Sequence, residues 1–549
     1  ISTIILLSIF ISFVFAIDAC SQIKAFEPAP LNVALKCLRS IPFNATRAQN
    51  TISNLEKAMQ VYTFLDIATN PPDQKHFIKV DLLAGLKEIG SKKFNSDIDF
   101  HMAVAGLFRQ LGDAHTRYRP PKCYYQYFNF LNVVPLFGYA DSPTSKPTLA
   151  IVDPEGVAAG LYPRNQGYEN VLTLAKQKFG PKWVDEIRDA TVLKINKQNG
   201  WDYVLNYAND SVGISKSLET RLNLALTKFF HRKTALGMFN ARNLNWNPLP
   251  PVDALEITHN TTDGVVKTLK YDWFMLSDYD VLSNEAFYED CYGNGTYGAT
   301  VNNVKARRSS PLSAAEFDNL VLNDPHHTVP PSVASSKLFQ DPPGFRLVEQ
   351  TATVTFWVGK NSAGETCLVM FLPSFSIPDD DDAFARAVSR GYAAGQRYGA
   401  TKLIIDLSGN GGGNICVGLA LLDYTGLGIG QVYSDMPGSE LANEMATRLA
   451  GTNTQAWSSL AYASVKTGKP YQTKEWLVPG VQRVRGGKKR NYSQYLHLSE
   501  LSCGSARFHF NATVEFKPSD VVIVTKGEAG STAALFSNHA AKYAHVKTA

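Results

Sequence analysis

The pattern of apolar and polar positions divides the chain into three parts. Residues 45–116 carry apolar side chains at helical spacing, as in SNLEKAMQVYTFLDIA and FHMAVAGLFRQLGDAH. From 123 to about 265, short strand-like runs such as PTLAIVDPE and ATVLKINKQNGWDYVLNYA alternate with turns. Residues 266–300 are aromatic and again strand-like. The pattern therefore predicts a helical first part and a strand-rich middle part.

The last third of the chain mixes strand and helix patterns. TVTFWVGK and TCLVMFLPSFSI are typical of strands, and DDDDAFARAVSRGYAAGQRYG is typical of a helix with an acidic first turn. TKLIIDLSGNGGGNICVGLALLDY continues as strand, glycine turn and helix. SDVVIVTK is a further buried strand before a second helix pattern. Strand–helix–strand order of this kind predicts a parallel sheet.

Two segments lie outside these patterns. Residues 301–345 carry Pro, Ser and charge without sustained periodicity, which predicts a linker or a long exposed loop. Residues 3–16 form an apolar run that is short for a membrane span and is followed by polar residues, which favours a secretory signal peptide. No later segment approaches 18 uncharged apolar residues, so we expect a secreted protein that is not attached to a membrane after signal cleavage.

Composition narrows the class of protein. The 549 residues suffice for two to four domains, and the net charge of +5 is small for that length. The basic clusters at 305–308 and 488–490 are short, so nucleic-acid binding has little support.

Seven cysteines without a Cys-x-x-Cys spacing argue against a structural zinc site. In an oxidising compartment some should pair, with Cys20 and Cys37 as the first candidates. The odd number leaves one thiol free or one partner outside the chain.

Six Asn-x-Ser/Thr sequons agree with a secreted glycoprotein, although an Asn-rich chain produces several by chance. They lie at Asn44, Asn209, Asn260, Asn294, Asn491 and Asn511.

The segment GEAGSTAALFSNHA, residues 527–540, places Ser531 at a strand-to-helix turn. Serine is a preferred helix N-cap residue, and taken alone this segment favours a cap. The Gly-x-Ser-x-Gly pentapeptide of esterases is absent. The choice between a cap and a nucleophile therefore depends on the rest of the chain.

The segment LIIDLSGNGGG, residues 403–413, is the most informative in the chain. A buried strand ends in successive glycines, and a helix begins near Asn414. Backbone N–H groups at such a turn stabilise an anion, either a phosphate or the oxyanion of an acyl-transfer intermediate. The phosphate interpretation is weak, because no Lys-Ser/Thr follows the glycines and the spacing is not Gly-x-Gly-x-x-Gly.

A third segment, FRQLGDAHTRYRPP at 108–121, contains His115 at the end of a helical pattern. A single histidine in such a place is usually a surface residue. An activated serine does need a base, however, and a histidine within hydrogen-bond reach is the usual one.

In this order, GDAHT, FLPSF, DLSGNGGG and GEAGSTA resemble the tail-specific, C-terminal-processing serine peptidases, family 41 of the serine peptidases. The closest resemblance is to the branch with a Ser–His–acid triad, which includes a secreted chlamydial protease-like group and its fungal relatives. The core match covers about 350–549, and VLKINKQNGWDY resembles later strands of the PDZ-like domain of that group.

The resemblance implies an α/β fold with a crotonase-like parallel-sheet peptidase core. The implied organisation is a signal peptide (1–16), a helical region that carries the histidine (17–122), a PDZ-like β-rich domain (123–265), a strand-like segment with linker (266–345) and the peptidase core (346–549).

The resemblance also implies roles for individual residues. Ser531 would attack the scissile carbonyl, and His115 would take its proton and return it to the leaving amine. The N–H groups of Gly411 or Gly412 and of Thr532 would hold the oxyanion.

In this branch a downstream glutamate orients the histidine, but residues 532–549 contain no Asp or Glu. We therefore expect that acid beyond residue 549 of a longer chain. Glu528 is more typical of a turn residue. Lys542 and Lys547 would be the candidate bases of a Ser–Lys variant, but GDAHT favours His115.

Three functions follow from these patterns. The first is a secreted serine endopeptidase that acts on peptides or proteins without a metal or organic cofactor. The second is a non-catalytic peptide- or ligand-binding protein on the same scaffold. The third, least favoured, is a crotonase-like acyl-CoA enzyme. The substrate, a homodimer and activation by processing stay open.

Overall fold

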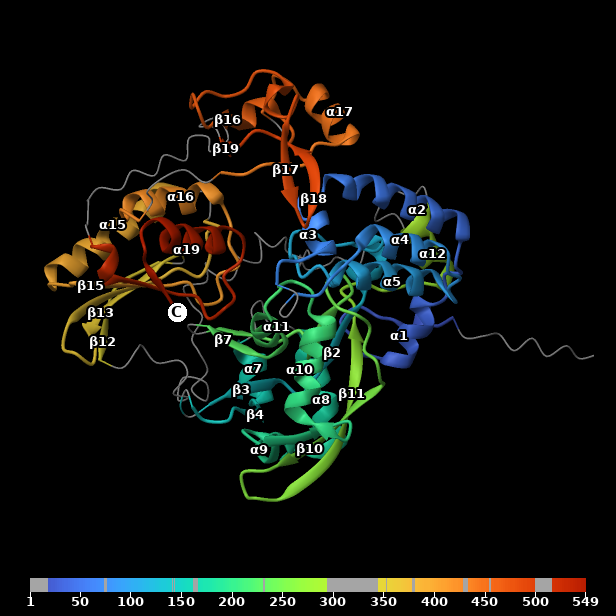
Figure 1. The fold of residues 1–549 in the computed structure, drawn as a ribbon. Helices are drawn as coiled ribbons and strands as arrows, with labels where there is room; N and C mark the ends of the chain where they lie inside the picture. The colour runs from blue at the N-terminus through green and yellow to red at the C-terminus, as the bar shows by residue number, and fades with distance from the viewer. Residues whose placement is uncertain are drawn as a thin grey trace, which may run out of the picture.

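The computed structural model has a mixed α/β fold with several sheets (Figure 1). It describes residues 18–549 with the exception of 74–76, 141, 143, 161–165, 231–232, 294–343, 352, 378–380, 428–432, 454–455 and 499–515. The expected signal peptide lies outside the described residues, and so does almost all of the expected linker. Within the described part of the chain, no helix combines the length and the apolar character needed to cross a bilayer.

The helices expected between residues 45 and 116 pack around an apolar core of their own, which includes Ile52, Leu86 and Val104. The two longest begin at polar caps, because the side chains of Asn44 and Ser96 accept hydrogen bonds from main-chain N–H groups. The helices of this region are α1 (Leu31–Leu38), α2 (Ala45–Ala58), α3 (Leu65–Thr69), α4 (Leu82–Gly90), α5 (Asp97–Arg109) and α6 (Lys122–Tyr127). Short 3-10 turns of the chain lie at Cys20–Gln22, Met59–Val61, Ser459–Ala461, Lys474–Trp476 and Pro518–Asp520.

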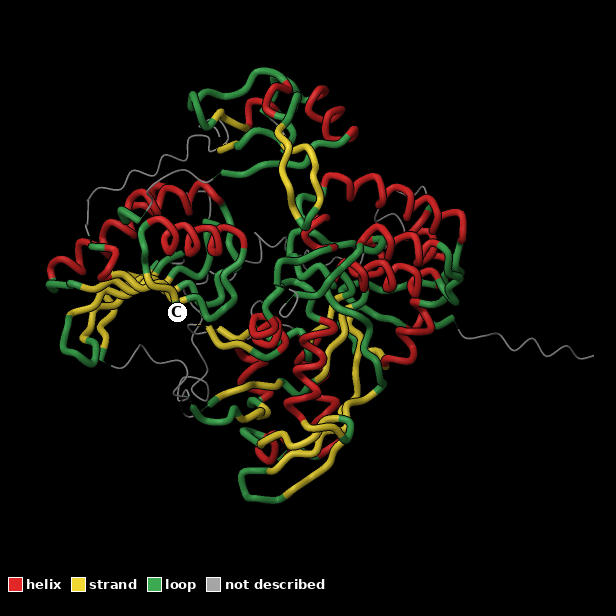
Figure 2. The backbone as a smooth tube through the Cα atoms, in the orientation of Figure 1, coloured by secondary structure: helices red, strands yellow, loops and turns green. Residues whose placement is uncertain are grey.

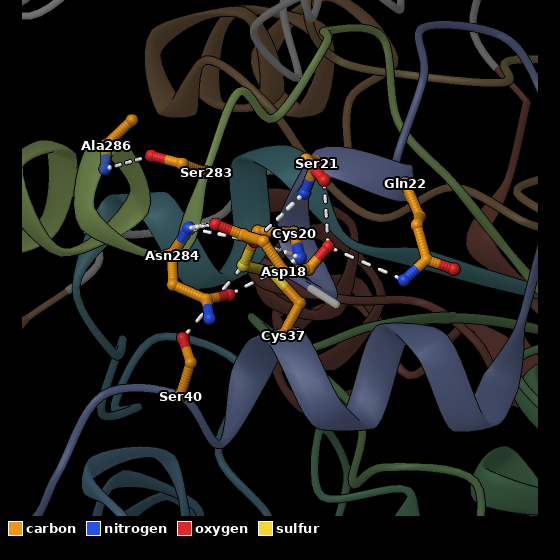
Figure 3. Close-up of a disulfide and its surroundings, with 9 residues drawn as sticks. All are labelled: Asp18, Cys20, Ser21, Gln22, Cys37, Ser40, Ser283, Asn284 and Ala286. Atoms are coloured by element: carbon orange, nitrogen blue, oxygen red, sulfur yellow. Dashed lines mark hydrogen bonds between the residues drawn. A yellow bond between two sulfur atoms is a disulfide. The ribbon is translucent and has the colours of Figure 1, made fainter. Parts of the chain in front are cut away.

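Two disulfides fasten the N-terminal part of the described chain: one links the first described residues to α1, and the other links the helical region to helix α12 (Asn284–Tyr292). Cys20 and Cys37 are disulfide-bonded, and beside them the Asp18 carboxylate accepts hydrogen bonds from the main-chain N–H groups of Cys20 and Asn284, both at 2.9 Å (Figure 3). A second disulfide, between Cys123 and Cys291, joins α6 to α12 across 168 residues of sequence. Cys367 is buried and free.

The middle of the chain forms a nine-stranded sheet with the order β3-β4-β5-β10-β11-β2-β9, in which β1 pairs with β11 and β6 with β5. Its strands are β1 (Ala29–Pro30), β2 (Asn129–Asn132), β3 (Leu136–Tyr139), β4 (Thr148–Ile151), β5 (Thr191–Ile195), β6 (Gln198–Asn199), β9 (Ala241–Asn243), β10 (Ala254–Asn260) and β11 (Val266–Leu276). The same part of the chain contains a separate hairpin, β7 (Lys228–Phe230) and β8 (Lys233–Ala235), and helices α7 (Pro154–Gly160), α8 (Gln166–Phe179), α9 (Trp183–Ile187), α10 (Gly200–Ser211) and α11 (Leu218–Ala225).

Two segments that the sequence pattern assigned to strands are helices. GWDYVLNYA belongs to α10, whose N-cap Asn199 accepts hydrogen bonds from two main-chain N–H groups. Its buried residues Val204, Tyr207 and Ala208 repeat at helical spacing. Residues 284–292, expected to continue a strand-like segment, form α12 behind the cap Ser283. In both places the cap and the 3.6-residue period outweigh the β propensity of aromatic and β-branched residues.

The last third of the chain forms a six-stranded sheet with the order β12-β13-β14-β15-β20-β21. The parallel pairing predicted there is confirmed, since β14, β15, β20 and β21 are parallel neighbours. The strands are β12 (Phe345–Gln350), β13 (Thr355–Lys360), β14 (Thr366–Phe371), β15 (Lys402–Asp406), β20 (Val521–Val524) and β21 (Lys547–Thr548).

Three helices connect the parallel strands: α15 (Asp381–Arg397), α16 (Ile415–Tyr424) and α19 (Ser531–Tyr543). In each connection the chain passes to the next strand in the same direction across the sheet. Crossovers of the same handedness therefore place their helices on the same face of the sheet. Figure 2 shows all three on that face. The carboxyl ends of β14, β15 and β20 consequently lie together at one edge of the sheet.

Between α16 and β20 the chain forms a small unit with its own apolar core around Trp476. It consists of α17 (Glu440–Arg448), β16 (Tyr462–Ser464), β19 (Leu496–Leu498) and the hairpin β17 (Val481–Arg485) and β18 (Lys488–Tyr492). The hairpin reaches α3 of the helical region (Figure 1), where Arg490 and Lys488 lie 3.1 Å and 3.7 Å from the buried carboxylate of Asp66.

Candidate active site

Ser531 is the first residue of α19 and has a left-handed backbone conformation, with φ 46°. Strand β20 ends at Val524, and the N-cap of the helix is Gly530, with no side-chain capping bond. Ser531 is therefore not the N-cap, and its side chain is exposed. A serine with positive φ costs about 1–3 kcal/mol of backbone strain, and such residues cluster at functional sites. A strained strand-to-helix turn that exposes a serine is also the geometry of a nucleophile elbow.

The glycine turn between β15 and α16 packs directly against Ser531. An alanine side chain built at Gly412 would lie 2.5 Å from Cβ of Ser531 and 2.9 Å from the main-chain nitrogen of Thr532. The φ of Gly412 is 108°, a conformation that favours glycine. Only a residue without a side chain therefore permits the two turns to approach this closely.

Hydrogen bonds hold the two turns together. Thr532 is buried, and its hydroxyl donates to the carbonyl oxygen of Gly413 at 2.7 Å. The N–H of Gly530 donates to the carbonyl oxygen of Asn410 at 3.2 Å. The contact between the glycine turn and the serine turn is consequently fixed on both sides of Ser531.

The arrangement places hydrogen-bond donors beside the serine hydroxyl. The first N–H groups of a helix have no partner within it, and those of Ser531 and Thr532 open α19. The 13-residue helix also directs the positive end of its dipole to this point. Gly411 is exposed, with open space around the position where a side chain would lie. Negative charge that develops next to Ser531 would be stabilised here.

The segment after β14 completes this edge of the sheet. The N–H of Phe375 donates to the carbonyl oxygen of Gly412 at 2.8 Å, and the N–H of Asn414 donates back to the carbonyl oxygen of Phe375 at 3.1 Å. FLPSF, DLSGNGGG and GEAGSTA, which are far apart in sequence, thus meet where three parallel strands end, the usual place for a ligand in an open α/β sheet.

His115 lies in the loop after α5, in the helical region. Asp113 shapes this loop, because its carboxylate accepts hydrogen bonds from the main-chain N–H of His115 at 2.9 Å and from the hydroxyl of Tyr62 at 3.1 Å. The imidazole is exposed, and it has no hydrogen bond with Ser531 or with a carboxylate among the residues described. Helices α5 and α19 lie in different parts of the molecule (Figure 1). The structure therefore brings Ser531, Gly411, Gly412 and Thr532 together, but does not bring His115 into contact with them.

The alternative bases are poorly placed. Lys542 lies in the last turn of α19, eleven residues after Ser531, which corresponds to about 16 Å along a helix. Lys547 is exposed in the edge strand β21. Among the described residues, neither lysine is hydrogen-bonded to Ser531. No group of three or more His, Cys, Asp or Glu among the described residues is arranged to hold a metal ion.

Glu528 lies in the serine turn, as its sequence position indicated, but it has a partner that sequence analysis missed. Its carboxylate lies 2.8 Å from the ammonium group of Lys228 in β7. Burial lowers the pKa of Lys228, and the neighbouring Glu528 opposes that shift. The two residues are 300 positions apart, and no local pattern connects them.

The sequons differ in exposure. Asn294 and Asn511 lie outside the described residues, and Asn260 is half-buried in β10. The three exposed sequon residues are Asn44, Asn209 and Asn491.

No protein-family model matches the chain, and no curated protein matches it. Solved structures do match over most of its length. They include mature CPAF (13% identity, TM-score 0.47, covering 92% of this chain and 82% of that one) and mature CPAF complexed with lactacystin (13%, 0.48, 92% and 83%). The photosystem II D1 C-terminal processing protease is similar at 10% identity and a TM-score of 0.23, over 90% of this chain and 78% of that one. Because these TM-scores lie below 0.5, we base the function on the geometry of the site.

Proposed function

We propose that the chain is a secreted serine endopeptidase of the tail-specific, C-terminal-processing kind. Its core would be crotonase-like, with a PDZ-like domain in the middle of the chain. The observation that carries the proposal is the contact between Gly412 and the strained, exposed Ser531 at the start of α19. A serine held by its backbone against N–H donors suits acyl transfer, since those donors can hold the oxyanion.

In the proposed reaction, Oγ of Ser531 bonds to the scissile carbonyl carbon while its proton passes to the imidazole of His115. The carbonyl oxygen becomes an oxyanion, held by the N–H of Thr532 and of Gly411 or Gly412. The bond from carbon to nitrogen then breaks, and the imidazolium gives its proton to the leaving amine. Water, deprotonated by the same imidazole, attacks the acyl-enzyme and releases the acid, and the proton returns to Ser531.

The proposal requires the loop of His115 to approach Ser531 more closely than it does in this structure. Hydrogen bonds between catalytic groups are often long or absent in free enzymes and tighten when substrate binds.

Replacement of the nucleophile tests the proposal. We expect Ser531→Ala to abolish hydrolysis of a denatured protein substrate and to leave folding unchanged, since the exposed side chain makes no capping bond. Ser537→Ala in the same helix is the matched control, because its hydroxyl donates to the carbonyl oxygen of Ala533 within α19. A folded Ser531→Ala protein that cleaves at the wild-type rate would end the proposal.

A binding protein without catalysis is the second candidate, and the lack of a hydrogen bond between His115 and Ser531 favours it. It predicts that the wild-type chain captures a peptide stably and never cleaves it, and that Ser531→Ala does not change the affinity.

A further inference from the structure

Asn410 is a completely buried polar residue of the glycine turn. Its side-chain amide makes two hydrogen bonds. Nδ2 donates to the carbonyl oxygen of Leu372 at 2.8 Å, and Oδ1 accepts from the N–H of Gly412 at 2.8 Å. Its main-chain carbonyl oxygen accepts from the N–H of Gly530. One residue is thus bonded to the segments that follow β14, β15 and β20.

The position of Asn410 explains why an amide stands there. Beyond the ends of the parallel strands, the backbone hydrogen bonds of Phe375 align the turn after β14 with the glycine turn, and the side chain of Asn410 adds to them. A primary amide carries donors and an acceptor at one end of a short side chain, so it can bond a carbonyl group on one side and an N–H on the other. An aspartate would keep the acceptor but place a buried charge against the carbonyl oxygen of Leu372.

The hydrogen bond between Asn410 and Gly412 also determines which main-chain N–H groups are free to bind a ligand. The N–H of Gly412 is occupied by Oδ1 of Asn410. The N–H of Gly411 makes no hydrogen bond within the described chain, and the residue is exposed. Of the two candidate glycines, Gly411 therefore has the available donor.

We propose that Asn410 is a positioning residue, which holds the glycine turn and the serine turn in one register and leaves the N–H groups of Gly411 and Thr532 as the oxyanion donors. This inference rests on the proposed peptidase function. Asn410 would not touch the substrate, and would act through Gly412 and Gly530.

The chain offers a matched control in Asn240, which is equally buried. The side chain of Asn240 donates to the carbonyl oxygen of Val134 and accepts from the N–H of Leu136, so it holds its own turn to one backbone segment in the middle of the chain. Asn240→Ala and Asn410→Ala therefore each remove one donated and one accepted side-chain hydrogen bond. Asn410 is bonded to the serine turn through Gly530, whereas the partners of Asn240 lie in the middle of the chain.

The test compares kcat, KM and backbone hydrogen exchange in the two variants. We expect Asn410→Ala to lower kcat at least a hundredfold and to change KM less than threefold, the loss typical of a misplaced oxyanion donor. Exchange over residues 525–535 should become at least tenfold faster. Asn240→Ala should keep the kcat of the folded protein and the exchange of that segment.

A folded Asn410→Ala protein with wild-type kcat and an active wild-type control would overturn the inference and leave the peptidase function intact. An inactive wild-type protein that includes the expected downstream acid would refute the peptidase function and the oxyanion role together. The exchange data would then decide the positioning role. Unchanged exchange over 525–535 would refute it. If Asn410→Ala fails to fold, Asn410→Asp serves as the second variant, because it keeps the shape and the acceptor of the side chain. Asn410→Asp must then show a lower kcat at unchanged KM. A wild-type kcat in Asn410→Asp would overturn the inference.

Discussion

Nζ of Lys228 lies 2.8 Å from Oε2 of Glu528, and this largely buried ion pair joins the middle of the chain to the turn that precedes Ser531. Two hydrogen bonds add to this anchoring. The hydroxyl of Thr220 donates to the carbonyl oxygen of Gly527, and the side-chain amide of Asn223 donates to the carbonyl oxygen of Lys526 at 2.9 Å. The conformation of the serine turn thus depends on α11 and β7 as well as on its own sequence.

The ion pair predicts strong coupling between its two partners. Removing one member leaves the other charge buried without a partner, which costs about 3–5 kcal/mol, whereas replacing both with neutral residues is often tolerated. We expect Lys228→Met to lower the free energy of unfolding by that amount, and the added change Glu528→Gln to restore most of it. Urea denaturation of the two single variants and the double variant measures the coupling. Additive effects would contradict a direct interaction.

We expect the substitution Gly412→Ala to reduce activity more than it reduces the stability of the fold. In Gly412→Ala the new methyl group meets Ser531, so we expect at least a hundredfold lower hydrolysis. Gly399→Ala is the matched control, since Gly399 also has a positive φ of 69° but nothing within 4 Å of the new methyl group. That variant should lose about 1–2 kcal/mol of stability, the cost of a left-handed conformation for an L-residue, and no activity. Equal activity in the two variants would refute the role of the close approach.

Because of the buried His259, we expect the folded protein to lose stability in mild acid. Its side chain is completely buried in β10, and burial lowers its pKa below the ordinary 6.5, with Lys267 lowering it further and Glu186 opposing. The unfolded chain therefore binds this proton first as the pH falls. The stabilisation is complete above about pH 6.5 and is lost as the pH falls toward and through the folded pKa, by at most about 1.4 kcal/mol per pH unit.

Unfolding free energies measured between pH 7 and pH 5 check this prediction. His259→Gln should flatten the pH dependence, and His545→Asn, a change at an exposed histidine, should not. An identical slope in wild type and His259→Gln would show that other groups cause the acid sensitivity.

The contact between the hairpin and α3 predicts a stabilising role for Asp66. The carboxylate is 4% exposed and bonds the guanidinium group of Arg490, so Asp66→Ala should cost about 2 kcal/mol of unfolding free energy. The exposed pair of Glu444 and Arg448 provides the comparison, and Glu444→Ala should cost less than about 0.5 kcal/mol. Similar losses in both variants would mean that the hairpin does not depend on Asp66.

Local patterns were sufficient to predict the parallel core. The apolar runs of β14, β15 and β20 are bounded by turns and helices, and the glycines before Asn414 mark where the backbone approaches another segment. The helix α10 could not be predicted in the same way, because its aromatic and β-branched residues also suit a strand and its cap Asn199 is a single residue.

The site was predicted less completely than the core. Ser531 was recognised as a turn residue, but its left-handed φ and the transfer of the cap to Gly530 arise from packing against Gly412. Lys228 carries no sequence signal, since its partner is far away in the chain. Where His115 lies relative to Ser531 likewise depends on how separate regions pack, which no local pattern specifies.

The most direct test of the account is the reaction of the protein with a fluorophosphonate, followed by mass-spectrometric location of the adduct. The account predicts a single adduct on Ser531, abolished in Ser531→Ala, slowed at least tenfold in His115→Ala and unaffected in Ser537→Ala. A folded wild-type protein that includes the expected downstream acid and carries no adduct on Ser531 would contradict the account and leave a binding protein in its place.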